Sequence, residues 1–336
     1  MRVLERGSER IEIAVEGLAI TVRRYVAGEL VHEAVRRTGS LVKAKWDADW
    51  LARRELDAGF HQVAAEVIVA LDHVELMAAI EAAPDDNDTK LVLADWLTER
   101  NDPWGQLIAL QHAKEALPPD AGDRYDELEF TELELRFRIA SRLWGKLADP
   151  AHANGTRLHY LVRADWECGF VREVTIEHAQ PATFPLIVEG LATLDTTRLL
   201  RQLTIGASTW HPGMLEVLAT HCWPHLRELA ITGLEAVTTA RLIPLVDDAC
   251  MPALAALDLI GIASPDTLCR AIATRPIARR LRSLTMQRCH FGDDAIQALV
   301  TAPFDVLEEL HLGDVGPAHA ATTLAGVAAR VVVDWL

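Results

Sequence analysis

The sequence contains no uninterrupted apolar run that approaches the roughly 18–20 residues a membrane-spanning helix needs. Its first ten residues alternate in charge and lack the apolar core of a secretion signal. The five cysteines are odd in number and widely scattered, which argues against a disulfide framework. These absences favour a cytoplasmic protein with no membrane partner.

The familiar sequence motifs of catalysis are also missing. There is no Gly-rich phosphate loop, no Gly-x-Ser-x-Gly elbow and no His-Glu-x-x-His pair. The densest group of potential metal ligands, His211, His221, Cys222 and His225, is interrupted by a Trp-Pro dipeptide that would break an aligning helix. We therefore predict no enzymatic activity, no cofactor and no metal site, although thirteen histidines leave a site assembled from distant residues open.

The charge is unevenly distributed along the 336 residues, whose formal net charge is −16. Residues 1–60 carry 11 Lys/Arg against 10 Asp/Glu, whereas residues 61–150 carry 8 against 19. An acidic surface repels phosphate backbones, so the whole-chain field argues against nonspecific binding of nucleic acid. Only the near-neutral N-terminal part escapes this objection.

A ladder of apolar residues organises the C-terminal half of the chain. Six times the sequence places apolar residues at the first, fourth and sixth positions of a six-residue unit, and successive units begin 26 to 29 residues apart. The units begin at Val171, Leu200, Leu226, Leu254, Leu281 and Leu307. Such a recurrence is typical of stacked supersecondary units, which bury a continuous core against their neighbours.

The stretches between the units predict helices, and residues 330–336 predict a last, truncated strand that caps the array. The predicted helices span 214–220, 237–247, 266–273 and 293–300. The passage 289–299, Cys-His-Phe-Gly-Asp-Asp-Ala-Ile-Gln-Ala-Leu, resembles the strand-to-helix passage of ribonuclease-inhibitor-type leucine-rich repeats. The resemblance implies an α/β fold in which residues 151–336 form a leucine-rich-repeat solenoid with parallel strands.

The turn position of each unit departs from that family, where Asn or Cys is usual. Only Cys289 matches, and the other units carry Ala179, Ser208, Leu234, Ile262 and Val315 there. Cys222 and Cys250 each lie four residues before a unit, and this shared register predicts that both are buried small apolar residues.

The residues between the buried positions of each strand would lie on the concave face of the array. We predict that this face binds another protein and that the chain is a non-enzymatic scaffold. The predicted contact residues are Arg172, Glu173, Arg201, Gln202, Arg227, Glu228, Asp258, Arg282, Thr285 and His311. Arginine recurs at one repeat position four times, which predicts either a column that engages carboxylates or a surface in which each arginine pairs with an adjacent acid.

The middle of the chain, residues 65–150, has the pattern of successive helices. We expect helices over 64–83, 90–100, 103–117 and 124–148, with Asp88 capping the second and Asp102 capping the third ahead of Pro103. Residues 79–111, with their Ala-Asp-Trp-Leu core, resemble the bacterial repeat-companion domain, a module that usually precedes leucine-rich or similar repeats. No enzymatic activity follows from that resemblance.

The N-terminal segment predicts a small β-sheet module. Residues 10–23 alternate as a hairpin with its turn at Glu16-Gly17, residues 29–36 are extended, and residues 46–58 form a helix that stops at Gly59.

This order of elements over residues 1–64 resembles a WGR domain, but Arg24-Tyr25-Val26 stands where the family has Trp-Gly-Arg. Because some WGR domains contact DNA, a nucleic-acid contact through this module is the alternative function. The basic residues that would form a patch there are Arg23, Arg24, Arg36, Arg37, Lys43 and Lys45, and the ten interspersed acids favour a mixed, solvated surface instead.

Overall fold

The computed structural model describes residues 2–16, 19–37, 51, 54–55, 58–62, 74–118, 120–148, 162–177, 183–206, 210, 212–247, 249–313, 324 and 326–334. The chain divides into two compact units, Met1–Leu71 and Asp72–Leu336. The predicted boundary near residue 64 and the one at residue 150 both fall outside the described residues, the latter within the second unit.

The first unit is an antiparallel sheet in the order β4-β3-β2-β1-β5. Its strands are β1 (Arg2–Arg6), β2 (Glu9–Glu16), β3 (Ala19–Val26), β4 (Glu29–Arg37) and β5 (His61–Gln62). The sheet forms because apolar residues alternate with polar ones and so gather on one side. That side buries Leu4, Ile11, Ile13, Ile20 and Phe60 in a small core.

The predicted hairpin and extended stretch are confirmed. Strands β2 and β3 pair from Glu9↔Val26 to Glu16↔Ala19, and β4 continues the sheet on the other side of β3. Strand β1 was not predicted, because its five residues contain only two apolar side chains. The body of the expected helix over 46–58 lies outside the described residues.

The second unit begins with helices, as the sequence pattern predicts. They are α2 (Val74–Ala82), α3 (Asn87–Glu99), α4 (Pro103–Glu115), α5 (Gly122–Arg138), α6 (Ala140–Trp144) and the 3-10 turn η1 (Gly145–Ala148). The cap of α4 is confirmed: the Asp102 side chain accepts from the Trp104 backbone N–H at 2.9 Å, and Pro103 occupies the first turn.

Two predictions in this segment are wrong in detail. The cap of α3 is Asp86, whose carboxylate accepts from the Asp88 backbone N–H and from the Thr89 hydroxyl. Asp88 itself lies inside the helix. The expected single helix over 124–148 is broken at Ile139, whose ψ of 20° leaves helical geometry, and again at Gly145, whose φ of 51° suits glycine.

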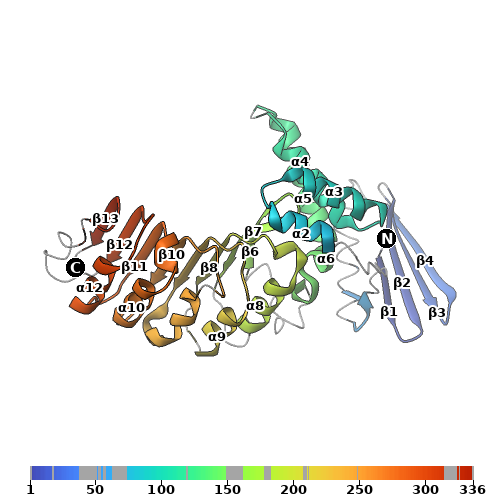
Figure 1. The fold of residues 1–336 in the computed structure, drawn as a ribbon. Helices are drawn as coiled ribbons and strands as arrows, with labels where there is room; N and C mark the ends of the chain where they lie inside the picture. The colour runs from blue at the N-terminus through green and yellow to red at the C-terminus, as the bar shows by residue number, and fades with distance from the viewer. Residues whose placement is uncertain are drawn as a thin grey trace. The chain divides into compact units, whose positions relative to one another are not determined.

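The rest of the second unit is a mostly parallel sheet of eight strands among the described residues, in the order β13-β12-β11-β10-β9-β8-β7-β6 (Figure 1). Its strands are β6 (Val162–Glu167), β7 (Phe170–Ile176), β8 (Gln202–Gly206), β9 (Glu228–Thr232), β10 (Ala256–Ile260), β11 (Ser283–Gln287), β12 (Glu309–Gly313) and β13 (Arg330–Asp334). The six predicted strands and the final strand are confirmed. Strand β6, which forms an antiparallel hairpin with β7, was not predicted.

Equivalent residues of successive strands lie in register, so the apolar positions form continuous buried rows. Val174, Leu203 and Leu229 are paired partners in neighbouring strands and are at most 1% exposed. The row continues through Leu257, Leu284 and Leu310. Burial of apolar area in such rows is the main source of stability, at roughly 25 cal/mol per Å².

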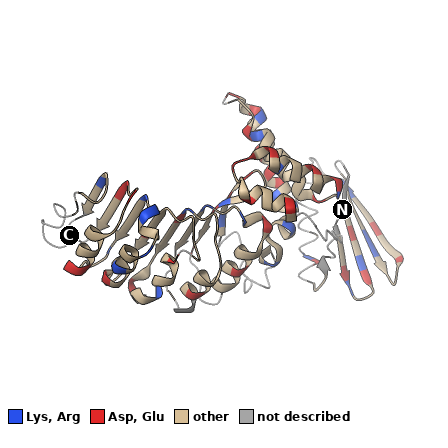
Figure 2. Cartoon of the chain, in the orientation of Figure 1, with Lys and Arg blue, Asp and Glu red and all other residues tan. Residues whose placement is uncertain are grey.

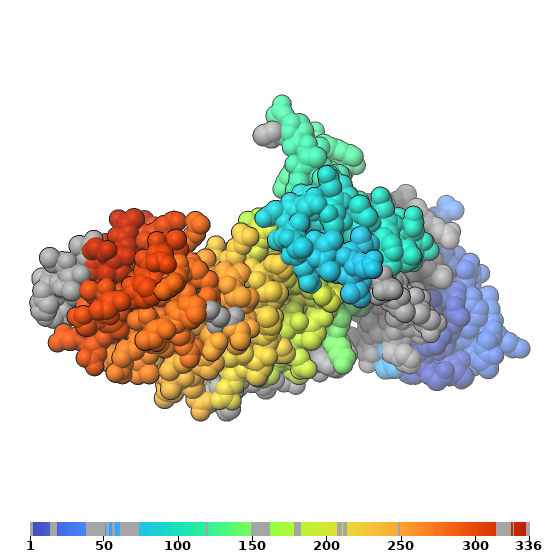
Figure 3. All heavy atoms as spheres, in the orientation of Figure 1, coloured from blue at the N-terminus to red at the C-terminus, as the bar shows by residue number. Residues whose placement is uncertain are grey.

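Helices lie along one face of this sheet (Figure 1). They are α8 (Phe184–Thr193), α9 (Pro212–Thr220), α10 (Asp266–Thr274), α11 (Ile277–Arg280) and α12 (Asp293–Thr301), with the turn η2 (Asp195–Thr197) after α8. In the space-filling view, the described residues of successive units lie against one another from yellow to red (Figure 3). The predicted helix over 237–247 is instead two 3-10 turns, η4 (Thr239–Arg241) and η5 (Ile243–Val246), which follow a third, η3 (Leu234–Ala236). Pro244 cannot donate a helical hydrogen bond, which explains this irregular stretch.

The helical segment is joined to the sheet at the turn between β6 and β7. The Gly169 carbonyl accepts from the Trp104 indole Nε1–H at 2.7 Å, and the Gly169 N–H donates to Gln111 Oε1 at 2.5 Å. Trp104 is fully buried and meets Phe170 edge-on, with ring centroids 5.3 Å apart. This joint fixes the first strand of the array against α4.

Across the described part of the chain, no helix has the length and apolar character to cross a bilayer.

Candidate functional site: the strand face of the parallel sheet

The sheet face opposite the helices carries three rows of side chains. Backbone hydrogen bonds build the first row at or just before the start of the strands: Arg201 N–H donates to Arg172 O, and Arg227 N–H donates to Arg201 O, each at 2.8 Å. The same pattern continues to Ala255, Arg282, Glu308 and Arg330. The predicted arginines therefore do lie in one row, which we call the arginine row (Arg172, Arg201, Arg227 and Arg282), although Ala255 interrupts it.

The first two arginines of the row are engaged within the chain. Arg172 pairs with Glu167 of β6 at 2.7 Å. Arg201 pairs with Asp85 from the turn between α2 and α3, and its side chain is only 16% exposed. The hydrogen bond from Arg201 holds the pKa of the Asp85 carboxyl below its ordinary value. The adjacent-acid alternative thus applies to this end of the row.

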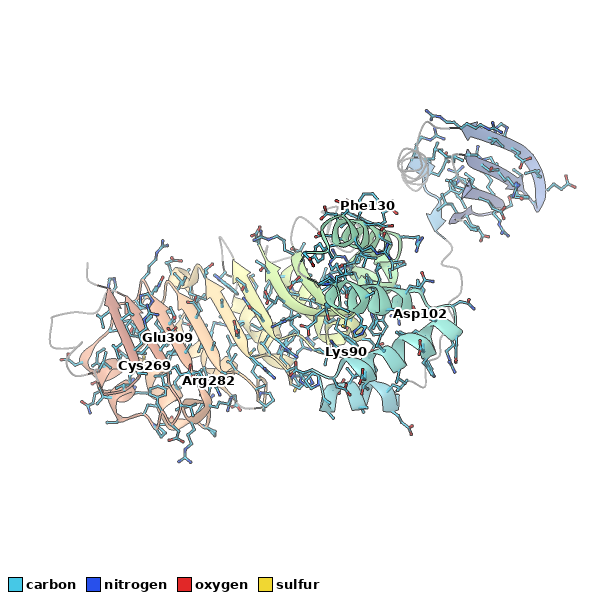
Figure 4. The ribbon with its side chains drawn as sticks, turned by 90° about the horizontal axis from the view of Figure 1, so that it is seen from above. Lys90, Asp102, Phe130, Cys269, Arg282 and Glu309 are labelled. Atoms are coloured by element: carbon cyan, nitrogen blue, oxygen red, sulfur yellow. The ribbon has the colours of Figure 1, made fainter. Side chains whose placement is uncertain are left out.

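The other two arginines face solvent. Arg227 is exposed and has no ion pair among the described residues, whereas Arg282 pairs with Glu308 at 3.2 Å with both side chains more than 60% exposed. Arg330 of β13 pairs with Glu309 of β12 at 2.9 Å, so the sign of the charge alternates from Arg282, just before β11, through Glu309 to Arg330 (Figures 2 and 4). Exposed pairs of this kind contribute little to stability and can exchange for pairs with a partner.

A second group of polar residues lies deeper on the strand face. Asp258 is paired in register with Ala230 on β9 and with Thr285 on β11, and Thr285 is paired with His311 on β12. Gln287 Nε2 lies 3.3 Å from His311 Nδ1. We call these residues, with the neighbouring Ala256 of β10, the Asp258 patch: Ala230, Ala256, Asp258, Thr285, Gln287 and His311.

Asp258 is the unusual member of the patch. Its Oδ1 is buried and has no hydrogen-bond partner among the described residues. Burial raises the pKa of the Asp258 carboxyl above its ordinary value, and the charge of His311 opposes that shift. A buried acceptor without a donor destabilises the fold by about 1–3 kcal/mol. Few such atoms occur in folded proteins, and a functional role is one reason for their retention.

The remaining predicted contact residues lie on the same face. Glu173, Gln202 and Glu228 are successive partners in β7, β8 and β9, and only Glu228 is exposed; the other two are half-buried. The ten predicted residues thus fall into two groups on the strand face. At the β7–β8 end, Arg172 and Arg201 form ion pairs within the chain. The residues around the Asp258 patch, at the other end, form the candidate binding surface. Gln287, Ala230 and Ala256 were missed, although the same register points to them.

The cysteine predictions have mixed outcomes. Cys222 is exposed, so its predicted burial is wrong, and Cys250 is half-buried, with its thiol 2.8 Å from the Ala219 carbonyl oxygen. The turn position is buried in all three units where it is described, as Leu234, Ile262 and Cys289. The thiol of Cys289 donates to the Gln287 carbonyl at 3.1 Å, within the turn that follows β11.

Within the first unit, two of the predicted basic residues, Arg23 and Arg24, pair with acids. Arg23 donates to Glu33 at 2.7 Å, and Arg24 lies within 3.8 Å of both Glu9 and Glu55. These contacts favour the mixed, solvated surface over a basic patch. Lys43 and Lys45 lie outside the described residues.

An apolar stripe on α5 also escaped prediction. On this charged helix, Phe130 (Figure 4) is followed at helical spacing by Leu133 and Phe137, and the three side chains are 44–63% exposed.

Comparison with known proteins gives no family. The sequence matches no protein-family model. It matches no curated protein. A crystal structure of a Bacteroides fragilis protein, solved by a structural genomics consortium, is similar to it with 12% sequence identity and a TM-score of 0.35, over 99% of this chain and 95% of that chain. Similarity at this level does not establish a shared fold.

Proposed function

We propose that this chain is a leucine-rich-repeat protein, without enzymatic activity, that binds another protein through the strand face of its sheet. Three features support the proposal: the period of 26–29 residues, the alternation of parallel strands with helices, and the Leu-x-x-Leu-x-Leu pattern in register. Arrays of this kind create extended binding surfaces. The helical segment fits a companion module of such repeats, and the first unit fits a WGR-like module.

One observation carries the proposal: the unpaired Oδ1 of Asp258 on the strand face. Its closest neighbours in the sheet include Ala230, paired with it on β9, and Ala256, two residues earlier on β10, and neither side chain can donate a hydrogen bond to it. A donor on a partner, such as an arginine or lysine side chain, would satisfy the carboxylate. Contacts of this type, half-buried and hydrogen-bonded to a charge, are strong enough to anchor an interface.

The surroundings suit a peptide or protein of mixed charge. Arg227 on one side and Glu309 on the other offer exposed charges of opposite sign, and Thr285 and Gln287 offer neutral hydrogen-bonding groups. Rim charges mainly set the association rate and the specificity, while the buried carboxylate sets the residence time.

A peptide-display selection against the full-length chain tests the proposal. We expect wild type to enrich peptides that share a basic anchor, and Asp258→Asn to lose most of their affinity, at least tenfold. Asp293→Asn is the matched control, because it removes one carboxylate from an exposed position on α12, on the helix side of the sheet. Equal affinity of the three proteins for the selected peptides, or no enrichment at all, would remove the Asp258 patch as a binding site.

The alternative, a nucleic-acid contact through the first unit, stays a prediction. The internal pairing of Arg23 and Arg24 does not favour it.

A further inference from the structure

Three potential metal ligands converge beside the joint between α4 and the β6–β7 turn. His112 and Glu115 lie one helical turn apart on α4, and Cys168 comes from the turn. One ring nitrogen of His112, a carboxylate oxygen of Glu115 and the sulfur of Cys168 all lie within 4.8 Å of one another. We propose that these three residues bind one Zn²⁺ ion.

The fold holds Cys168 over the helix by the same contacts that fix Gly169. The Gly169 N–H and carbonyl are both bonded to α4, through Gln111 and Trp104. Cys168 is 1% exposed and has a φ of 45°, a left-handed conformation that is uncommon outside glycine. Backbone strain of this kind is retained when the surroundings impose it, and here it aims a thiol at one turn of α4.

The ligands have partial support from neighbouring side chains. The Cys168 Sγ lies 3.3 Å from Glu115 Oε2, and Asn87 Nδ2 donates to the same oxygen at 3.5 Å. A hydrogen bond such as the one from Asn87, made to a ligand by a residue that does not itself bind the metal, orients metal ligands in many proteins. The Nδ1 of His112 is buried and has no hydrogen-bond partner among the described residues, so the ring has an uncommitted nitrogen.

The ligand set matches Zn²⁺ in its chemistry. Zinc binds thiolate sulfur, imidazole nitrogen and carboxylate oxygen, and sites with three protein ligands keep a fourth position for water or another group. The thiolate and the carboxylate would supply two negative charges to the ion. Glu115 as a whole is exposed, which gives the ion a path of entry from solvent.

A cation also lies close to this cluster. Lys90 on α3 is 2% exposed, and its Nζ donates to Asn87 Oδ1 at 3.0 Å and to none of the three ligands among the described contacts (Figure 4). The carboxylate of Glu167, on β6, is engaged by Arg172. The cluster is thus bordered by one lysine, one carboxamide and one paired carboxylate, and the two anionic ligands offset the charge of Lys90.

The sequence did not predict this site because its ligands are far apart. The spacing His112-x-x-Glu115 is a weak signal on a helix, and Cys168 follows 53 residues after Glu115. The sequence is denser in potential ligands at residues 211–225. His211 lies outside the described residues, and within the rest of that cluster no group of three ligands comes together.

Titration of the full-length, metal-free and reduced chain with Co²⁺ tests the proposal. Cobalt replaces zinc in such sites, and a bound thiolate gives an intense near-ultraviolet charge-transfer band. We expect one equivalent of Co²⁺ to produce this band in wild type, and added Zn²⁺ to abolish it. The band should vanish in Cys168→Ser, and His112→Asn should bind Co²⁺ at least tenfold more weakly.

Cys222→Ser is the matched control, because it removes an exposed thiol next to the histidine-rich segment and leaves the cluster intact. It should titrate like wild type. A Zn²⁺-dependent rise of the melting temperature in wild type and in Cys222→Ser, but not in Glu115→Gln, gives a second measurement should Cys168→Ser fail to fold. Absence of the band in wild type, or its loss in Cys222→Ser and retention in Cys168→Ser, would overturn the proposal.

Discussion

The indole N–H of Trp104 donates to the carbonyl oxygen of Gly169 at 2.7 Å, across 65 positions of the chain. This contact places the turn between β6 and β7 directly on α4. It therefore sets the position of the first strand, against which the remaining strands stack in register. The helical segment and the array are consequently coupled at one small, fully buried joint.

Substitution of Gly169 tests this coupling. Its φ is 82°, and a Cβ there would overlap the Ile108 side chain and lie 3.0 Å from the Trp104 Nε1. Gly169→Ala should destabilise the second unit by about 2–5 kcal/mol, because left-handed strain and overpacking add. Urea denaturation followed by circular dichroism measures the change. Gly122→Ala is the control, since its φ of 37° is also positive but no atom lies within 4 Å of the new Cβ. If Gly122→Ala lost as much unfolding free energy as Gly169→Ala, backbone strain alone would be responsible.

The buried carboxylate of Asp102 has two tasks in the helical segment. It caps α4, and it accepts from Arg142 Nε at 2.8 Å, while the Arg142 guanidinium lies 4.9 Å from the centre of the Trp104 ring. Asp102→Ala should destabilise the unit by about 2–4 kcal/mol, because a cap and a partly buried ion pair are lost together. The corresponding substitution at Asp86, the half-buried cap of α3, which pairs with no arginine among the described residues, should have a clearly smaller effect in the same denaturation experiment. Equal losses would mean that the Arg142 pair contributes nothing.

Local patterns predicted the fold well wherever the period of the apolar residues was unambiguous. The Leu-x-x-Leu-x-Leu units give every strand from β7 to β12, because each buried position recurs in register. Prediction failed where tertiary contacts decide. Strand β6 has no unit of its own and exists because it pairs with β7, and the stretch 237–247 loses its helix at Pro244.

The candidate binding face was predictable as a face but not in its detail. The repeat register alone places Arg201 among the exposed residues. Only the three-dimensional structure shows that Asp85, in the α2–α3 turn, forms an ion pair with it. The unpaired oxygen of Asp258 is likewise a three-dimensional property, since it depends on the residues two strands away. Distance in sequence hides the Cys168 cluster for the same reason.

The raised pKa of Asp258 makes a prediction about pH. Because the folded-state pKa lies above the unfolded value, the folded protein holds this proton to higher pH, and stability falls as pH rises through the interval between the two values. Asp258→Asn should therefore be more stable than wild type at neutral pH, by about 1 kcal/mol, or a few degrees in melting temperature.

The difference in melting temperature between Asp258→Asn and wild type should shrink as pH falls toward about 4, the ordinary value for an aspartate. Scanning calorimetry over this range measures it, with Asp293→Asn as a control that should differ little from wild type at every pH. A variant less stable than wild type at pH 7 would show that a donor already satisfies the carboxylate.

The five thiols should react at very different rates in the folded chain. Burial raises the pKa of Cys168 and of Cys269 to about 12, with Glu115 adding to the shift at Cys168 and Asp266 at Cys269. Since the thiolate is the reactive form, both should resist alkylation by iodoacetamide at pH 8, and the buried Cys289 should resist it for want of access. Cys222 is exposed and should be labelled first, followed by the half-buried Cys250. Peptide mass spectrometry after timed alkylation gives the order, and labelling in denaturant supplies the reference in which all five react. Labelling of Cys168 as fast as Cys222 in the native chain would mean that the β6–β7 turn opens from α4 and that the joint at Gly169 is not persistent.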